Sequence, residues 1–258
     1  MGNAARRLDP CLVALGSTGL LAWSALLLDQ SDSIPPAFCS AGTPWAAPLS
    51  ISLDLVLAFN SPAQLASGWA LMVAAMMSPL VIAPLRHVRD RSFARRRARS
   101  MLIFVAGYAA VWMTAGIGLQ AMALGARWAA PAPLICLALA AASAMGWQVS
   151  PAKQWCLNRC HRRPHLAAFG AAADRDALAF GLANGASCVG ACWALMLLTL
   201  LVGRGHLVAM IAVAFFVVAE RLEGPAPLAW HWRGLGKALR ITMAQAHMRG
   251  RCIREAAQ

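Results

Sequence analysis

The sequence is short of charged residues. Asp, Glu, Lys and Arg make up 13% of its 258 residues and 60% of the chain is hydrophobic, whereas soluble domains average about a quarter charged and about half apolar. A soluble core of this size does not need several uncharged stretches of roughly 18 to 25 residues, the length that crosses a bilayer. The composition therefore argues against a soluble domain and indicates an integral membrane protein.

Other common signals are also missing. The first apolar run ends in Leu26-Leu27-Leu28-Asp29 without a small-residue cleavage site, so we expect it to remain as a signal anchor. The sequence has no nucleotide loop, Ser-His-Asp set or paired-carboxylate site, and it does not predict an enzyme. Its net charge of +13 falls in blocks between apolar runs, so we expect no nucleic-acid partner.

Six uncharged stretches predict membrane-spanning helices. Their length and their lack of polar alternation favour helices over barrel strands. The predicted fold class is therefore all-α, a polytopic membrane helix bundle of about six transmembrane helices. The spans run approximately from Cys11 to Leu28, Gly68 to Leu85, Met101 to Leu124, Pro131 to Trp147, Ala177 to Val202 and His206 to Ala219.

The basic residues predict the orientation of the chain. If the N-terminus is cytoplasmic, all of the 23 Lys and Arg residues except Arg127 and Arg204 fall on the inside, as the positive-inside rule describes. We therefore expect an N-in/C-in, multi-pass protein of a bacterial-type inner (plasma) membrane, with the lipid bilayer as its surroundings.

The predicted organisation has four parts. They are residues 1–28 (N-terminal tail and first transmembrane helix), 29–67 (outside loop), 68–221 (membrane core of five helices) and 222–258 (basic amphipathic cytoplasmic tail). In the outside loop, the stretch from Leu49 to Phe59 is interrupted by Asp54 and is too short to span, which predicts a short interfacial helix. Cys39 has no partner cysteine in this loop, so we interpret it as a free thiol or an intermolecular contact.

Sulfur side chains recur at helical spacing in two of the spans. Thioethers and thiolates are soft ligands that suit Cu(I), but Met and Cys are also ordinary packing residues. Packing is favoured for the methionines taken alone, and metal binding is favoured for the cysteines, which lie one turn apart. The candidates are Met72, Met76 and Met77 in the second span and Cys188, Cys192 and Met196 in the fifth.

Two further features lie near the cytoplasmic side. Cys156 and Cys160 have a four-residue spacing that places both thiols on one helix face, and basic neighbours favour thiolate. A metal entry point and an inert helix are equally compatible with them. Glu220 ends the sixth span beside Arg221; an interfacial or ion-paired role is favoured, although a carboxylate inside a bundle can also bind or relay an ion.

Four motifs and a glutamate, in this order and spacing, resemble a known family. It is the family catalogued as domain of unknown function 2182, described as predicted metal-binding integral membrane proteins. The resemblance runs from about Gly68 to Arg221. It rests on WALMVAAMMSP (69–79), GYAAVW (107–112), PAKQWCLNRCHRRP (151–164), GLANGASCVGACWALM (181–196) and Glu220.

The resemblance implies a metal site within the membrane. The chain departs from the family in having Arg221 where a Lys is expected and in the extra His161 beside Cys160. The matching positions are Met76, Met77, Cys156, Cys160, Cys188, Cys192, Trp193 and Glu220.

The sequence thus favours a non-enzymatic membrane protein that handles copper as Cu(I), for storage, delivery or transport. A metal chaperone or a membrane protein is the expected partner, and the sequence does not define the oligomeric state. Two alternatives stay open. One is a quinone-linked thiol oxidoreductase that uses Cys188 and Cys192 as an exchanging pair. The other is a scaffold subunit whose small residues, Gly181 and Gly185 among them, pack against partner helices.

Overall fold

The protein is seen in a computed structural model that describes residues 10–29, 62–130, 132–202, 205–232 and 240. In this part of the chain the backbone forms seven α-helices and no strand. The predicted all-α fold class is therefore confirmed.

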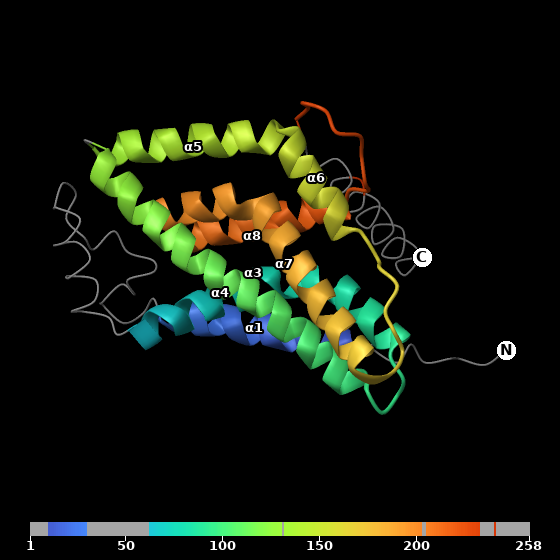
Figure 1. Cartoon of the computed structure of the whole chain (residues 1–258). Helices are drawn as coiled ribbons and strands as arrows, with labels where there is room; N and C mark the ends of the chain where they lie inside the picture. Colours follow the sequence, from blue (N-terminus) through green and yellow to red (C-terminus); the bar gives the residue numbers. More distant parts are fainter. Residues whose placement is uncertain (1–9, 30–61, 131, 203–204, 233–239, 241–258) are drawn as a thin grey trace, which may run out of the picture.

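Each predicted span coincides with a helix of the structure (Figure 1). The segment from Pro151 to Cys160, which the sequence analysis placed near the cytoplasmic side with both thiols on one helix face, forms a helix of its own. The helices are α1 (Pro10–Asp29), α3 (Pro62–Arg91), α4 (Arg97–Ala129), α5 (Pro133–Val149), α6 (Pro151–Cys160), α7 (Gly170–Leu201) and α8 (His206–Leu222).

Helices α4 and α7 form the tightest pair, because glycines let their backbones touch. A Cβ atom on Gly107 would lie 3.0 Å from the carbonyl oxygen of Leu178, and one on Gly181 would collide with the carbonyl oxygen of Phe104. Gly185 meets α4 in the same way one turn further on. Gly181 and Gly185, which the sequence analysis named as packing positions for another helix, therefore pack against α4 of the same chain.

The two helices of this pair run parallel, so their ends coincide (Figure 1). At the starting end, Arg96 and Arg99 bind the Asp174 carboxylate at 2.6 and 2.7 Å. At the other end, the Arg127 guanidinium donates to the carbonyl oxygen of Leu200 at 2.9 Å. Two predicted spans separated by one other should run in the same direction, and the parallel pair agrees with that alternation.

The remaining helices pack around this pair. Helix α1 packs on α3, α8 packs against both α3 and α7, and α5 packs against α7 at the far edge of the molecule (Figure 1). Helices α5 and α6 meet at a bend of 64°. The Ser150 hydroxyl caps α6 by accepting from the backbone N–H of Lys153 at 3.2 Å, and Pro151 occupies the first turn, where its missing N–H costs nothing. The bend turns α6 back towards α7.

Several helices are compatible with a membrane protein. By length and composition α3, α4 and α7 are long and apolar enough to cross a bilayer, and the bent pair α5–α6 adds a fourth if it forms one span. Helix α1 is shorter over its apolar part, Val13–Leu28, and α8 has 17 residues. The described residues thus give three or four candidate spans, and about six stays a prediction.

Some predictions lie outside the described residues. These are the interfacial helix between Leu49 and Phe59, the interpretation of Cys39, and nearly all of the basic tail beyond Trp232. The division of the chain into four parts stays a prediction as well.

Candidate metal centre

The cysteine and methionine stripe of α7 faces the protein interior. Cys188 and Cys192 are each 1% exposed, and Met196 is 0% exposed. The Cys192 thiol donates to the carbonyl oxygen of Cys188 at 3.1 Å, the usual way in which a small polar side chain satisfies itself inside a helix. Both thiols are free cysteines. The structure therefore places two free thiols one turn apart in a buried core.

Aromatic residues of α4 hold the Cys188 thiol in place. The Tyr108 hydroxyl donates to Cys188 Sγ over 3.3 Å. The Trp112 indole also lies close to this sulfur, although its N–H does not meet the geometry of a hydrogen bond. The glycine contacts between α4 and α7 bring Tyr108 and Trp112 to this position. Sequence reasoning included both in the GYAAVW motif but gave them no role.

The methionines of α3 lie in the same buried core. Met72, Met76 and Met77 are all buried, and they belong to one hydrophobic cluster with the α7 sulfur residues. Helices α4 and α8 each pack against both α3 and α7, and the Trp69 indole of α3 donates to the carbonyl oxygen of Trp112 at 2.8 Å.

One buried methionine escaped the sequence reasoning. Met210 of α8 is 0% exposed and belongs to the same cluster. It stands alone in its helix, without the i, i+4 repeat that identified the other candidates. A search for repeated sulfur spacing therefore had no signal at this position.

The thiols of α6 lie on a different side of α7. Cys156 and Cys160 are both buried, and Cys156 Sγ fills the space that a Cβ atom on Gly190 would occupy, at 2.6 Å. Because successive helix residues are rotated by about 100°, Gly190 points nearly opposite to Cys188. The structure thus separates the two cysteine pairs by the backbone of α7.

Glu220 forms a buried ion pair, and its partner is Lys153 rather than the neighbouring Arg221. Lys153 Nζ lies 2.7 Å from Glu220 Oε2, and the two side chains are 0% and 2% exposed. The Gln148 amide donates to Glu220 and accepts from Lys153. Lys153 and Glu220 are both within electrostatic reach of Cys192.

The burial of Lys153 is a feature that the sequence analysis did not anticipate. There it was counted with the cytoplasmic basic residues that flank the spans, but it is wholly buried. The reason is the 64° bend between α5 and α6, which directs the first turn of α6 into the bundle, where Glu220 supplies the opposite charge. In the sequence, Pro151 is the one indication that the chain bends here.

The donor set in this core is dominated by sulfur. In the described part of the chain, no group of three or more His, Cys, Asp and Glu residues gathers closely enough to hold a metal ion. A thiol pair in the core can bind a soft ion with few donors, alone or with neighbouring thioethers. Soft monovalent metals accept such a set of donors, whereas zinc sites generally use four Cys, His or carboxylate donors.

An all-α bundle with thiols and thioethers in its interior is the class of protein that suits a soft metal ion. Residues 66–243 match a family model, PpoB2, described as "Copper chaperone". The match covers more than half of the chain, and the chain belongs to this copper chaperone family. No curated protein and no solved structure matches the chain.

The family match confirms the expected relation to copper. The matched range contains all of the sequence-predicted candidates, from Met72 to Glu220. The match is to the PpoB2 family and not to domain of unknown function 2182, so the resemblance to the latter stays a prediction.

Proposed function

We propose that the protein is an integral membrane copper chaperone that holds Cu(I) between Cys188 and Cys192, with methionine thioethers completing the site. The observation that carries this proposal is the fully buried thiol pair of α7, in a chain of the copper chaperone family. Met196 and the α3 methionines Met72, Met76 and Met77 are the thioether candidates in the same core.

The chemistry of the core favours the monovalent ion. Cu(I) prefers soft donors and few of them, whereas Cu(II) prefers nitrogen and oxygen donors in a square arrangement. Burial of these side chains limits competition from solvent for the ion. Copper is the cargo here, and a site of few sulfur ligands can pass an ion on by exchanging one ligand at a time.

Cys156 and Cys160 provide a second thiol pair that receives or delivers the ion. The pair lies on α6, which leads into the basic segment with Arg159, Arg162 and Arg163, the side predicted to be cytoplasmic. In this proposal a soluble metal chaperone meets the protein on that side. The recipient or donor on the other side is a further membrane or exported protein.

The two alternatives find less support. A scaffold that uses Gly181 and Gly185 to bind partner helices needs a free glycine face, but α4 of the same chain covers it. A thiol oxidoreductase needs a partner thiol to reach Cys188 or Cys192, and both are buried. Neither alternative accounts for the copper chaperone family.

The test is the copper content of the detergent-purified protein after anaerobic loading with Cu(I), measured by mass spectrometry. We expect near-stoichiometric copper in the wild type and almost none in the C188S/C192S variant. C136S is the matched control, because Cys136 is also a buried free thiol but lies on α5. Equal copper in the double variant and in the control would contradict the proposed site.

A further inference from the structure

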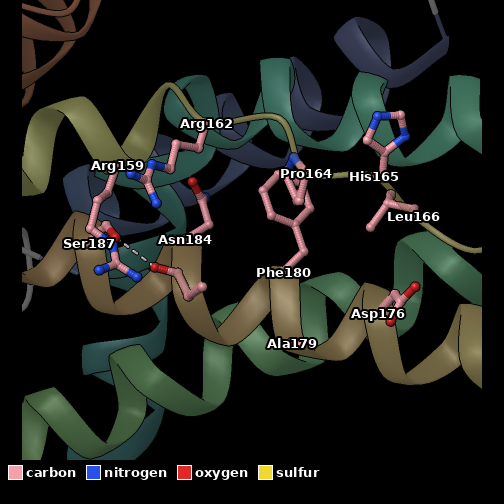
Figure 2. Close-up of a pocket in the computed structure, with 11 residues that line it drawn as sticks. Arg159, Arg162, Pro164, His165, Leu166, Asp176, Ala179, Phe180, Asn184 and Ser187 are labelled. Atoms are coloured by element: carbon pink, nitrogen blue, oxygen red, sulfur yellow. Dashed lines mark hydrogen bonds between the residues drawn. The ribbon is translucent and has the colours of Figure 1, made fainter.

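A cavity of about 270 Å³ lies between the first half of α7 and the segment that connects it to α6. Its polar lining is separate from the sulfur core. Figure 2 shows the side chains of Arg159, Arg162, Asn184 and Ser187 gathered at one end, with His165 and Asp176 at the other.

The two arginines have no acidic partner in the described part of the chain. Arg159 stacks over the Trp155 ring at 4.5 Å, which leaves the edge of its guanidinium group free to donate. Asp174 binds Arg96 and Arg99. Asp176 lines the other end of the cavity and accepts from the backbone N–H of Ala167 at 2.9 Å. Two arginines against one carboxylate leave the cavity with a net positive charge, and that charge lies at the arginine end.

Asn184 adds an unsatisfied amide to this end of the cavity. Its side chain is 3% exposed, and neither the amide nitrogen nor the amide oxygen has a hydrogen-bond partner. In Figure 2 it points from α7 into the cavity, towards Arg162. Buried polar groups are nearly always hydrogen-bonded, so the amide indicates an occupant that accepts a hydrogen bond.

The wall on the α7 side of the cavity is apolar and open. Ala179 and Ala183 line it and are exposed, and Leu166 and Phe180 add further apolar lining. A negatively charged group held by the arginines would therefore have an apolar surface beside it. That combination fits a molecule with an anionic head and hydrocarbon tails.

We propose that this cavity binds the phosphate group of an anionic membrane lipid, with Arg159, Arg162 and the Asn184 amide as its donors. Guanidinium groups match phosphate oxygens in geometry and charge. Basic pockets on the cytoplasmic side of membrane proteins recognise anionic headgroups in this way. The lipid source rests on the membrane location proposed above, whereas a phosphate-binding cavity as such does not.

The positive charge also makes the cavity unsuitable for a bare copper ion. Two guanidinium groups repel a cation, and the cavity offers no sulfur among its lining residues. Yet Ser187 directly precedes Cys188 on α7, and Asn184 lies about one turn before it. A headgroup in the cavity would thus sit beside the sulfur core without belonging to it.

The experiment uses the full-length protein in nanodiscs of mixed phosphatidylglycerol and phosphatidylcholine, with retained lipids counted by native mass spectrometry. We expect the wild type to retain phosphatidylglycerol selectively, and R159Q/R162Q to retain roughly ten- to thirtyfold less, the effect of two basic residues at an anionic surface. N184A should also lower retention. The matched control is R95Q/R175Q, which removes the same charge from two exposed arginines outside the cavity.

A second arm uses inorganic phosphate on the detergent-purified protein, with thermal stability as the readout. Stabilisation of the wild type but not of R159Q/R162Q, together with lipid retention independent of these arginines, would overturn the lipid and leave a free phosphate as the occupant. Equal retention and equal stabilisation in the cavity and control variants would overturn the proposal altogether. Copper content measured on the same samples separates this outcome from failure of the copper proposal, because R159Q/R162Q should keep its copper.

Discussion

The protein contains two cysteine pairs with the same spacing and different surroundings. Cys188 and Cys192 of α7 lie in a core of methionines, with an aromatic hydroxyl on one thiol. Cys156 and Cys160 of α6 pack against the other side of α7, and Cys156 fills the gap at Gly190. Four-residue spacing therefore says only that two thiols share a helix face. The groups around each pair decide what it can bind.

The largest expected difference between the two cysteine pairs is in how much copper the protein keeps when each pair is removed. C188S/C192S should lose nearly all bound Cu(I), because it removes the only thiols of the proposed site. C156S/C160S should keep the final copper content but load more slowly, since it removes only a receiving pair. Copper content after short and long loading times checks both. If C156S/C160S also ends without copper, the comparison fails and the α6 pair is part of the binding site.

The next effect concerns the buried ion pair beside the α7 thiols. K153M leaves the Glu220 carboxylate buried without its partner, which typically costs about 3–5 kcal/mol of stability. The double variant K153M/E220Q removes both charges and should recover much of that loss. Denaturant titration in detergent measures these differences, and an equal loss in the single and double variants would show that Lys153 acts through packing rather than charge.

Removing the Tyr108 hydroxyl, which donates to the Cys188 thiol, should have a smaller effect. Y108F keeps the aromatic ring against α7 but deletes the hydrogen bond of 3.3 Å. Groups that orient a metal ligand typically contribute at least about tenfold in affinity, so we expect Cu(I) affinity to fall by about that factor. Competition with a chelator measures it. An unchanged affinity with an unchanged unfolding midpoint would mean that the hydroxyl does not orient the thiol.

The smallest expected effect tests whether the α6 cysteine pair is independent of the proposed copper site. G190A places a Cβ atom 2.6 Å from Cys156 Sγ, so the thiol must rotate away and should react faster with an alkylating reagent. Copper content should stay that of the wild type. G146A on α5 is the matched control, because its Cβ atom would meet nothing within 4 Å. Copper loss in G190A alone would show that the two pairs are coupled through α7.

Much of the fold could be predicted from the sequence because apolar length is a local property. The six uncharged stretches all coincide with helices of the structure, and the roles of Gly181 and Gly185 followed from their size alone. The alternating directions of the spans also followed, and the parallel pair α4 and α7 agrees with them. These features depend on one stretch of chain at a time.

The contacts of the site could not be predicted in the same way. Lys153 and Glu220 are 67 residues apart, and Tyr108 and Cys188 are 80 residues apart. Each pair depends on how the helices pack, which the letters of one helix do not contain. The sequence placed Glu220 beside a cation, as it is, but named the adjacent Arg221 and not Lys153. The lone Met210 and the amide of Asn184 became candidates only through their surroundings.

The backbone contact between α4 and α7 has a consequence for how copper leaves the protein. With Gly107 and Gly181 packed directly against the opposite backbone, sliding or parting α4 and α7 would break close contacts at both positions. Tyr108 and Cys188 lie on this pair of helices. We therefore expect release from the proposed site to involve the elements around the pair, by a shift of the α3 methionines or a hinge motion at the α5–α6 bend.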